Sequence, residues 1–339
     1  MRTLVYAEPH KLELRDAPMP SPRPTEVVVT VEAAGVCGSD LHGYLGKSLN
    51  RKPPLVMGHE FAGVVTSVGS AVRDLPAGTA VAVYPLITCG HCPACRRGDS
   101  SQCPSRQVIG IHRPGGFAEF AAVPRASVVP LPSGMTAFTA SLAEPLANAV
   151  HIFNRNVHGL VRRVAIFGAG TQGVMALHLA RLLSPPVLAS VDVVPARLAL
   201  AVRLGATAAL NAGTEDAVAR IRELTGGEGV DLAVEAAGSA ATRQAALASV
   251  RTGGTVVLLG LGEEITPLNA VDIVNREITI RGSYAYTRDD FVRAVELLGT
   301  GLIRGEWARP YSLEAGPIVF RQLTTDPGDL IKAVLTPAS

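Results

Sequence analysis

The sequence predicts a mixed α/β protein with a β-rich domain and a second domain built on a doubly wound parallel sheet. Three observations support this fold class. The chain has 339 residues, which is too long for one ordinary core and suits two domains. Up to about residue 140 it holds short apolar runs bounded by Gly and Pro, and from about residue 145 apolar strands alternate with helices.

The β-rich part has four candidate strands and no long helix. Each is a short alternating or β-branched run, which is the pattern of a small antiparallel domain. The four runs are 25–36, 61–72, 79–85 and 117–124.

The second part alternates strand and helix. Its strands lack a polar alternate face, as expected when helices cover both sides of a parallel sheet. We expect strands at 161–168, 187–192, 230–238, 255–262 and 277–283, and helices at 172–183, 195–205, 215–226 and 240–251.

The last part of the chain holds one amphipathic helix, 289–301, and one strand, 329–337. These are too few to fold alone, so we expect the tail to return to the β-rich domain. The predicted boundaries are 1–146 with 285–339 for the first domain and 147–284 for the second.

Charge and hydropathy exclude several classes of partner. The 31 basic and 29 acidic residues are interspersed, with a net charge of +2 and no Lys/Arg block, which argues against nucleic acid. The N-terminus meets charge and proline too early for a signal peptide, and no apolar run approaches the length of a membrane span. We expect a soluble, cytoplasmic protein.

The stretch GAGTQG at 168–173 matches G-x-G-x-x-G. Alone this motif is a weak signal for a dinucleotide site, but its sequence context here makes the signal strong. An apolar strand precedes it, a helix follows, and Asp192 ends the next apolar strand 24 residues after Gly168. Gly168 would permit the tight turn, Gly170 the approach of a pyrophosphate, and Gly173 the close packing of helix on strand. Asp192 would accept hydrogen bonds from the adenosine ribose and repel the extra phosphate of NADP, which favours NAD. The alternative is a glycine-rich turn with Asp192 as a helix cap.

Four of the five cysteines lie within fifteen residues, in TCGHCPACRRGDSSQC. The spacing suits four thiolates around one zinc with no open position, so the expected site is structural. The lobe has few apolar residues, and metal coordination would supply its folding free energy. A redox pair or an iron–sulfur cluster is the alternative. The four are Cys89, Cys92, Cys95 and Cys103.

The remaining cysteine, Cys37, stands in GVCGSDLH beside Ser39, Asp40 and His42. A free cysteine is most often a small buried hydrophobe. Without Cys37 beside them, the other three would be interpreted as a turn residue, a cap and a surface imidazole.

Two further stretches favour a chemical role for Cys37. GHE places His59 and Glu60 at the edge of a strand, and AEPLANAVH places Glu144 just ahead of a helix that begins at Pro145. Each stretch alone is a weak signal, because a lone His or Glu is usually a solvated or satisfied side chain.

Taken together, these residues occur in the order and at approximately the spacings seen in the zinc-dependent medium-chain dehydrogenase/reductase family. The chain resembles this family over nearly its whole length. The glutamate in EPLANAVH is similar to the polyol, threonine and sugar-phosphate dehydrogenase branch. The resemblance implies a GroES-like catalytic domain that carries two zinc sites, made of the N-terminal half and the C-terminal tail. A Rossmann NAD-binding domain would be inserted between them.

The resemblance also implies a catalytic zinc site. Cys37, His59 and Glu144 would hold the zinc and leave one open position, which distinguishes a catalytic site from a structural one. Glu60 would lie next to the metal, able to replace water or to act as a ligand, and Asp40 would orient His59.

Further roles follow from the same resemblance. Ser39 would take a hydrogen bond from the substrate hydroxyl, and His42 would pass the proton through the cofactor ribose to solvent. Lys332 matches a basic position that contacts the pyrophosphate in relatives, although a surface lysine is an alternative. Glu119 has no role that we can derive.

The expected reaction is the reversible oxidation of a secondary alcohol to a ketone, with zinc as a Lewis acid and hydride transfer to NAD. The resemblance implies a polyol, amino alcohol or sugar-alcohol phosphate as substrate. Within these classes, Tyr44, Lys47 and Arg51 make the loop 41–55 polar, which favours a polyol or a phosphorylated sugar alcohol. The alternatives are a dehydrogenase of simple alcohols and a non-catalytic NAD-binding protein. A homodimer or homotetramer is the expected assembly.

Overall fold

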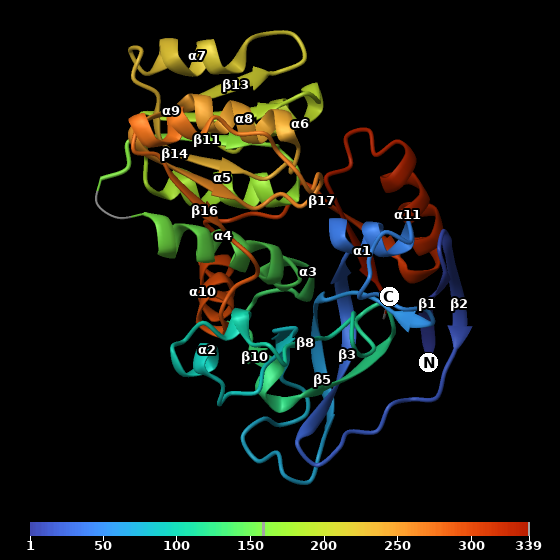
Figure 1. Cartoon of the computed structure of the whole chain (residues 1–339). Coiled ribbons are helices and arrows are strands. Elements are labelled where there is room, and N and C mark those ends of the chain that lie inside the picture. The colour runs from blue at the N-terminus through green and yellow to red at the C-terminus, as the bar shows by residue number, and fades with distance from the viewer. Residues whose placement is uncertain (158–159, 338–339) are drawn as a thin grey trace. The chain divides into compact units, whose positions relative to one another are not determined.

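The structure is a computed structural model that describes residues 1–157 and 160–337 (Figure 1). It divides into two compact units, which are Met1–Glu144 with Thr287–Ser339 and Pro145–Tyr286. We call them the discontinuous unit and the continuous unit. Their junctions differ by two residues from the boundaries that the sequence predicts.

The discontinuous unit is built on a seven-stranded sheet in the order β10-β6-β5-β3-β18-β17, with β9 also paired to β3. The apolar alternation of these runs buries one face of each strand against a common core. The strands are β3 (Glu26–Gly35), β5 (Glu60–Val68), β6 (Ala80–Val83), β9 (Phe120–Pro124), β10 (Val128–Pro130), β17 (Ala308–Ser312) and β18 (Lys332–Thr336).

Two small sheets and short helices complete this unit. The small sheets have the orders β2-β1-β4 and β7-β8. Their strands are β1 (Arg2–Glu8), β2 (Lys11–Asp16), β4 (Leu55–Val56), β7 (Leu86–Ile87) and β8 (Gln107–Val108). The helices are α1 (Gly38–Tyr44), α2 (Pro93–Arg96), α3 (Ala137–Ala140), α10 (Arg288–Gly299) and α11 (Gly316–Thr325), with 3-10 turns at η1 (Ser100–Gln102), η2 (Arg125–Ser127) and η3 (Leu313–Ala315).

The C-terminal tail joins the N-terminal sheet. β18 pairs antiparallel with β3, and β17 pairs parallel with β18. The tail contains more than the one helix and one strand that the sequence predicts, because β17 and α11 are also present. The β17 sequence, ARPYS, has a proline and an arginine where an apolar run is expected, and α11 begins with Gly-Pro, which resembles a turn but suits a first helical turn.

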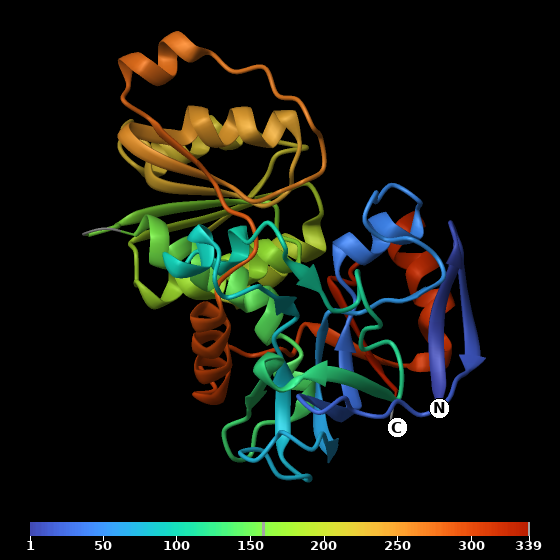
Figure 2. The same ribbon diagram turned by 60° about the horizontal axis from the view of Figure 1, so that its bottom comes forward.

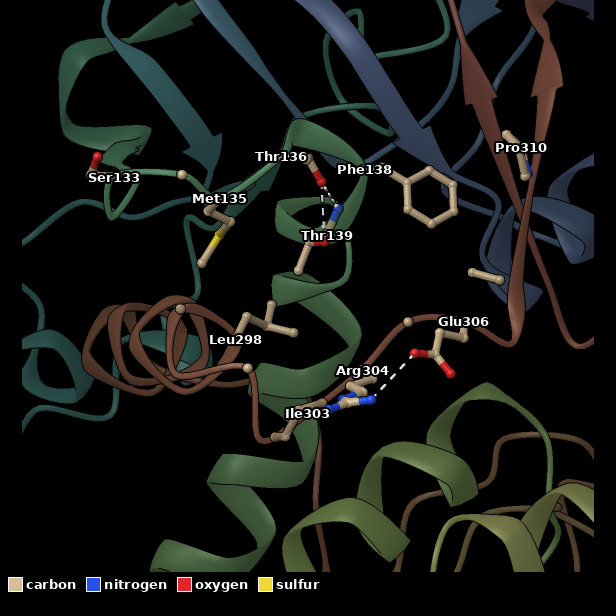
Figure 3. Close-up of a pocket in the computed structure, with 15 residues that line it drawn as sticks. Ser133, Met135, Thr136, Phe138, Thr139, Leu298, Ile303, Arg304, Glu306 and Pro310 are labelled. Atoms are coloured by element: carbon tan, nitrogen blue, oxygen red, sulfur yellow. Dashed lines mark hydrogen bonds and ion pairs between the residues drawn. The ribbon is translucent and has the colours of Figure 1, made fainter.

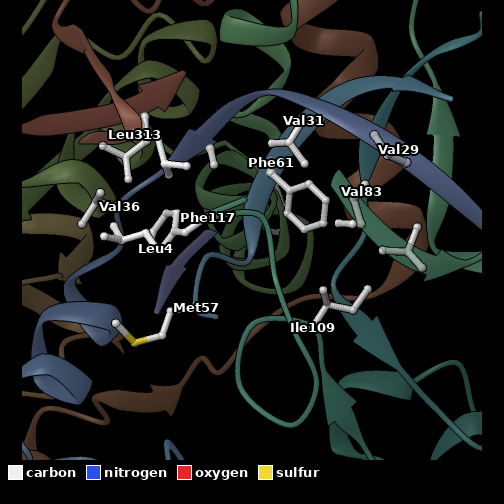
Figure 4. Close-up of a cluster of buried hydrophobic side chains, with 14 of the residues drawn as sticks. Leu4, Val29, Val31, Val36, Met57, Phe61, Val83, Ile109, Phe117 and Leu313 are labelled. Atoms are coloured by element: carbon white, nitrogen blue, oxygen red, sulfur yellow. The ribbon is translucent and has the colours of Figure 1, made fainter. Parts of the chain in front are cut away.

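One hydrophobic core holds both parts of this unit together (Figure 4). It includes Leu4 and Phe117 from the N-terminal part and Leu313 and Phe320 from the tail. The rings of Phe117 and Phe320 meet edge to face with 5.8 Å between their centroids. The tail is therefore part of the core and does not lie on its surface.

The continuous unit is a six-stranded parallel sheet in the order β13-β12-β11-β14-β15-β16. Strand order reverses between β11 and β14, which is where open α/β sheets bind ligands. The strands are β11 (Arg163–Phe167), β12 (Val187–Asp192), β13 (Ala208–Asn211), β14 (Val230–Glu235), β15 (Val250–Leu258) and β16 (Thr279–Gly282). The helices are α4 (Ala143–Asn156, of which the first two residues belong to the discontinuous unit), α5 (Thr171–Leu182), α6 (Pro195–Arg203), α7 (Ala217–Leu224), α8 (Ala240–Ser249) and α9 (Ala270–Asn275).

Both faces of this sheet are buried, and Figure 2 shows helices on either side of its strands. Along β11, Ala165 and Phe167 belong to one buried cluster, whereas Val164 and Ile166 belong to another. This alternation explains why the strand has no polar face. The sequence analysis missed β13, whose AALN has low β-propensity, and the six-residue α9.

Across the part of the chain that the structure describes, no helix has both the length and the apolar character that a membrane crossing requires.

Candidate metal and cofactor sites

The pairing of β3 with β5 creates the first candidate site. Gly35 at the end of β3 is the register partner of Glu60 at the start of β5. The residues that follow β3 therefore lie beside those that precede β5, and Cys37 is brought next to His59. Among the described residues, ligand atoms of Cys37, His59 and Glu60 all lie within 4.8 Å of one another.

A glycine in the left-handed backbone conformation directly precedes His59. Gly58 has φ +92°, and a Cβ there would lie 2.6 Å from the ring of Phe117. Only glycine satisfies both the backbone conformation and the close ring contact. The glycine of GHE therefore positions the histidine and does not bind a ligand itself.

Asp40 connects the parts of this site. As the third residue of α1, its Oδ2 accepts the N–H of Cys37 at 3.1 Å. Its Oδ1 lies 3.4 Å from His59 Nδ1, which is within ion-pair range but outside hydrogen-bond geometry, and it accepts Arg51 Nη2–H at 3.1 Å. The carboxylate thus faces Nδ1 of His59 and leaves Nε2 for another partner.

Charges in the site shift two pKa values. Burial would raise the pKa of Asp40, but His59 and Arg51 outweigh it and lower the pKa to about 2. Burial would lower the pKa of His59, but Asp40 and Cys37 outweigh it and raise the pKa well above its ordinary value. The carboxylate is therefore ionised wherever the protein is folded near neutral pH.

Ser39 and His42 lie on α1 next to the site. Ser39 is half-buried, and its Oγ accepts a hydrogen bond from Arg51 Nη2 at 2.9 Å. His42, three residues later and so one helical turn away, is exposed. The helix thus connects the site with solvent.

Glu144 lies in the first turn of α4, which begins at Ala143 and not at Pro145 as the sequence predicts. Proline is tolerated there because N–H groups of the first turn have no intrahelical partner. Glu144 is buried but is not in the group formed by Cys37, His59 and Glu60.

The structure places Lys332 in the interior of the discontinuous unit, beside the first candidate site. Its side chain is fully buried, forms an ion pair with Glu60 Oε2, and donates to the carbonyl of Val36 at 3.0 Å. Burial would lower its pKa, but the charges of Glu60, Cys37 and Glu144 outweigh it and raise the pKa. The alternative of a surface lysine is therefore wrong, whereas the pyrophosphate contact stays a prediction.

The donor set fits a zinc ion. Glu60 Oε1 is buried and has no hydrogen-bond partner among the described residues, which is costly for a carboxylate oxygen. A thiolate, an imidazole and a carboxylate are typical zinc ligands, and a bound cation would satisfy this oxygen.

The four clustered cysteines form the second candidate site, in the lobe that contains α2 and η1. Their sulfur atoms lie within 4.8 Å of one another, with Cys89 3.6 Å from Cys103 and 4.0 Å from Cys95. A zinc tetrahedron with Zn–S bonds of about 2.3 Å has edges of about 3.8 Å. The cysteines are free thiols, and the spacing therefore fits one zinc.

Backbone amides of this lobe point at the cysteine sulfur atoms and favour their thiolate form. Cys92 N–H points at Cys89 Sγ at 3.3 Å, and Cys95 N–H points at Cys92 Sγ at 3.5 Å. Amides of His91 and Cys92 lower the pKa of the Cys89 thiol to about 6, whereas desolvation raises that of Cys95 to about 11. Thiolates that accept N–H bonds are common around structural metals.

The continuous unit carries the dinucleotide fingerprint directly after β11. Gly168 has φ +93°, and a Cβ on Gly173 would lie 1.7 Å from the carbonyl oxygen of Gly168. No described atom lies within 4 Å of a Cβ placed on Gly170, which precedes α5. The open space and the free N–H groups of the helix suit a pyrophosphate.

Asp192 ends β12 beside this turn. Its Oδ2 accepts the N–H of Ala169 at 2.6 Å, and its Oδ1 accepts those of Val193 and Val194 at 2.8 and 2.9 Å. Asp192 is therefore a fixed, largely buried negative charge. The guanidinium of Arg197 lies 3.9 Å from Oδ2.

Sequence reasoning missed two residues near these sites. Arg51 is buried against Asp40 and Ser39, although the sequence suggested only a polar loop. Glu235, fully buried at the end of β14, accepts the N–H groups of Ala237 and Gly238 and shapes the loop opposite Gly168. For Glu235, the only signal in the sequence is a carboxylate at the end of the strand in VEAAG.

Glu119, for which the sequence suggested no role, has a structural one. It accepts the backbone and side-chain N–H groups of Arg2, which also pairs with Glu314 of the tail. Glu119 therefore holds Arg2, and Arg2 links the N-terminal strand to the C-terminal segment.

A cavity of about 730 Å³ in the discontinuous unit is not part of either metal site (Figure 3). Its lining includes Met135 and Phe138, just before and in α3, and Leu298 and Ile303, in and after α10. None of its lining residues is a metal-site residue, so it is no candidate for the substrate pocket.

Comparison with known proteins gives the family. Residues 23–133 match the family model of the alcohol dehydrogenase GroES-like domain, and residues 173–300 match that of the zinc-binding dehydrogenase. The chain is 33% identical over 308 residues to a sorbitol dehydrogenase from Bacillus subtilis (strain 168), covering 89% of this chain and 87% of that protein. The chain belongs to the zinc-binding alcohol dehydrogenase family.

Other family members agree with this assignment. An L-threonine 3-dehydrogenase from Bacillus velezensis is 35% identical over 295 residues, which are 86% of this chain and 85% of that protein. A zinc-binding dehydrogenase from Sinorhizobium meliloti 1021, solved bound to NADP, superposes with a TM-score of 0.93 at 32% identity, covering 99% of each chain. As a zinc-binding dehydrogenase the chain is an oxidoreductase that uses zinc and a nicotinamide dinucleotide, with a GroES-like domain and a Rossmann domain.

Proposed function

We propose that this zinc-binding dehydrogenase oxidises a secondary alcohol of an uncharged polyol to a ketone, with NAD as the hydride acceptor. The observation that supports it best is the cluster of Cys37, His59 and Glu60, with Ser39 on the adjoining helix. A protein that only senses NAD has no use for such a cluster.

The residues of the cluster have distinct proposed roles. Cys37, His59 and Glu144 hold a zinc, and Glu60 lies beside it, neutralised in part by Lys332. When bound, zinc polarises the substrate hydroxyl and NAD accepts the hydride. Glu60 need not be a permanent ligand in this assignment. Its Oε2 is paired with Lys332, and only its Oε1 has no hydrogen-bond partner among the described residues.

The proton of the substrate hydroxyl needs a path to solvent. Ser39 is two residues from Cys37, and its hydroxyl both accepts and donates hydrogen bonds. His42 follows one turn later on the exposed side of α1, and an imidazole can accept a proton at one ring nitrogen and release one from the other. We assign the first transfer to Ser39 and the exit to His42.

The preference for NAD is assigned to Asp192. Its carboxylate is fixed by three backbone N–H groups, so it cannot turn away from a 2′-phosphate. Arg197 could offset part of this repulsion, but it lies 3.9 Å from the carboxylate and counters only part of its charge.

The preference for an uncharged polyol comes from the loop 41–55. Among its polar residues, Arg51 is neutralised by Asp40 and Tyr44 is buried against the ring of Phe320. Lys47 and Lys52 are exposed, whereas the charge that the loop brings to the metal site, that of Arg51, is already paired. A relative that is a sorbitol dehydrogenase supports the same class.

A substrate panel tests this function. NADH absorbance would be followed with sorbitol, xylitol, threonine, galactitol 1-phosphate and ethanol, and zinc would be counted on the same sample. We expect the highest kcat/KM with a polyol and two zinc ions per chain. A clear preference for ethanol would favour a dehydrogenase of simple alcohols, and no turnover with two zinc ions bound would favour a binding protein.

We also propose a homodimer formed through the continuous unit. Strand β16 is an edge strand, paired only with β15. The segment that precedes it in sequence has four apolar side chains that are 68–79% exposed, which are Leu261, Ile265, Val271 and Val274. An edge strand with exposed apolar neighbours suits a second copy of the chain.

Sedimentation velocity tests the assembly. Val274→Asp should convert a dimer into monomers, and Leu302→Asp, at an exposed leucine of the discontinuous unit, should not. A wild-type monomer, or a dimer that survives Val274→Asp, would contradict this assignment.

A further inference from the structure

Arg51 makes contacts that the proposed function does not use. Its side chain is 4% exposed, and one nitrogen, Nη2, donates to both Ser39 Oγ at 2.9 Å and Asp40 Oδ1 at 3.1 Å. A buried guanidinium is always charged, and its planar donor geometry restrains what it contacts. Arg51 thus touches the proposed proton acceptor and the carboxylate that faces His59.

A glycine on α1 makes room for this side chain. A Cβ on Gly43 would lie 2.4 Å from Arg51 Cδ, 3.4 Å from its Nε and 3.4 Å from Met57 Sδ. The guanidinium therefore packs against the helix that carries Ser39. Its position suits contact with Ser39 and not with a charged group of the substrate.

We propose that Arg51 is a positioning residue for proton transfer, which holds Ser39 Oγ so that one lone pair and one O–H are left for the transfer. The inference rests on the proposed function. A serine hydroxyl has two lone pairs and one proton, and Arg51 occupies one lone pair.

The proton steps then balance. The remaining lone pair forms a bond to the proton that leaves the substrate hydroxyl, and the O–H bond of Ser39 breaks as its own proton moves onward. The electron pair of the substrate O–H bond would then form the C=O bond of the ketone, and NAD, when bound, would supply the acceptor for the hydride. Without Arg51 the hydroxyl can rotate among several acceptors, and fewer of its orientations are productive.

Steady-state kinetics with the best polyol test this role. Arg51→Met should lower kcat by about 10- to 100-fold, the usual cost of losing a partner that orients a site residue, while the KM for NAD stays within about twofold. Arg51→Lys, which keeps a charged donor, should recover most of the loss. Gly43→Ala, which displaces the guanidinium without removing it, should lower kcat in the same way.

A double-mutant cycle separates this role from a purely structural one. If Arg51 acts through Ser39, the Ser39→Ala, Arg51→Met double variant should be no slower than Ser39→Ala alone. Losses that multiply would mean that Arg51 acts through Asp40 only and would overturn the inference. The matched control is Arg113→Met, because Arg113 also pairs with a buried carboxylate, Glu26, in the same unit. It should leave kcat unchanged.

A second readout does not depend on activity. Urea unfolding of wild type, Ser39→Ala, Arg51→Met and their double variant should show a favourable coupling between Ser39 and Arg51. It should be larger than the coupling from a second cycle that uses Arg113→Met and the Ser39→Ala, Arg113→Met double variant. No coupling would overturn the contact itself. If wild-type protein oxidises no alcohol but the coupling is present, the proposed function fails while the contact stands.

Discussion

At the scale of single residues, one carboxylate organises the metal site. Asp40 holds the backbone of Cys37, faces His59 and neutralises Arg51, so three groups from separate segments depend on it. Such a buried, multiply paired charge is costly to disturb. The chemistry of GVCGSDLH therefore depends on a residue that touches no substrate.

Glu144 provides a residue-scale test of the zinc ligands. It lies outside the group formed by Cys37, His59 and Glu60, and its assignment as a ligand rests on the proposal above. Glu144→Ala should lower zinc content from about two to about one per chain, with the four-cysteine lobe still filled. The control is Glu306→Ala, at a glutamate 81% exposed in the same unit. Retention of both zinc ions in Glu144→Ala would exclude it as a ligand.

Asp192 provides a second test at this scale. Asp192→Ala should raise the KM for NAD by about 10- to 100-fold, since hydrogen bonds to a charged acceptor contribute about 1.5–3 kcal/mol. Discrimination against NADP should relax at the same time. Initial rates with both cofactors measure this, with Glu228→Ala, at an exposed glutamate of the same unit, as the control. An unchanged cofactor preference would remove Asp192 from the ribose site.

At the scale of elements, carboxylates and thiolates connect segments in addition to hydrophobic packing. Asp231 at the start of β14 accepts the N–H groups of Arg162 and Arg163 at 2.9 Å each, and Arg251 Nε–H at 2.7 Å. It thereby ties the beginnings of three neighbouring segments of the sheet.

The pairing of Asp231 predicts a pH-dependent stability. Burial would raise its pKa, but the bonds from Arg251, Arg162 and Arg163 outweigh it and lower the pKa. A carboxyl with a lowered folded pKa stabilises the protein above its unfolded pKa of about 4, and this contribution is lost as pH falls through the folded value. Asp231→Asn should cost about 1–3 kcal/mol at pH 7 and less at pH 3 by urea unfolding. An equal cost at both values would contradict this.

The cysteine lobe gives a prediction for α2 and η1. Cys103 is the most buried of its four ligands, and Cys103→Ser should remove one zinc and expose the arginines of the lobe to trypsin. Because thiolates must be deprotonated to bind, acidification should release this zinc as well. Cys37→Ser is the control, since it should remove the other zinc and leave the lobe resistant. A lobe that stays resistant without its zinc would show that packing suffices.

At the scale of the whole chain, the two ends of the sequence build one unit. Phe320 of α11 packs on Phe117 and Tyr44, so the tail completes the core that surrounds the metal site. Phe320→Ala should destabilise this unit by about 3–5 kcal/mol, because it leaves a cavity in a closed core. Ile318→Ala, two residues away but 68% exposed, should cost within about 0.5 kcal/mol. Equal effects in urea unfolding would mean that the tail is not part of the core.

How far the sequence predicts this molecule depends on the range of the interactions. The strands, the glycine turn and the four-cysteine spacing follow from local patterns, and the zinc ligands that we propose were implied by the family resemblance. The burial of Lys332 and Arg51 was not predicted, because a long cationic side chain looks the same in sequence whether it is buried or solvated. Burial of such a group depends on a carboxylate from another segment, as Glu60 and Asp40 show.

The register between β3 and β5 has a consequence for how this scaffold can diversify. Gly35 and Glu60 are fixed as partners, and Arg51 anchors the returning chain to α1. Residues 46–50 lie between α1 and Arg51, in the loop that we propose contributes to the substrate pocket, so insertions or deletions there would change this loop without shifting a proposed metal ligand. Substrate range could therefore be re-engineered by changing the length of one five-residue segment, while the reaction itself is preserved by the pairing of two strands.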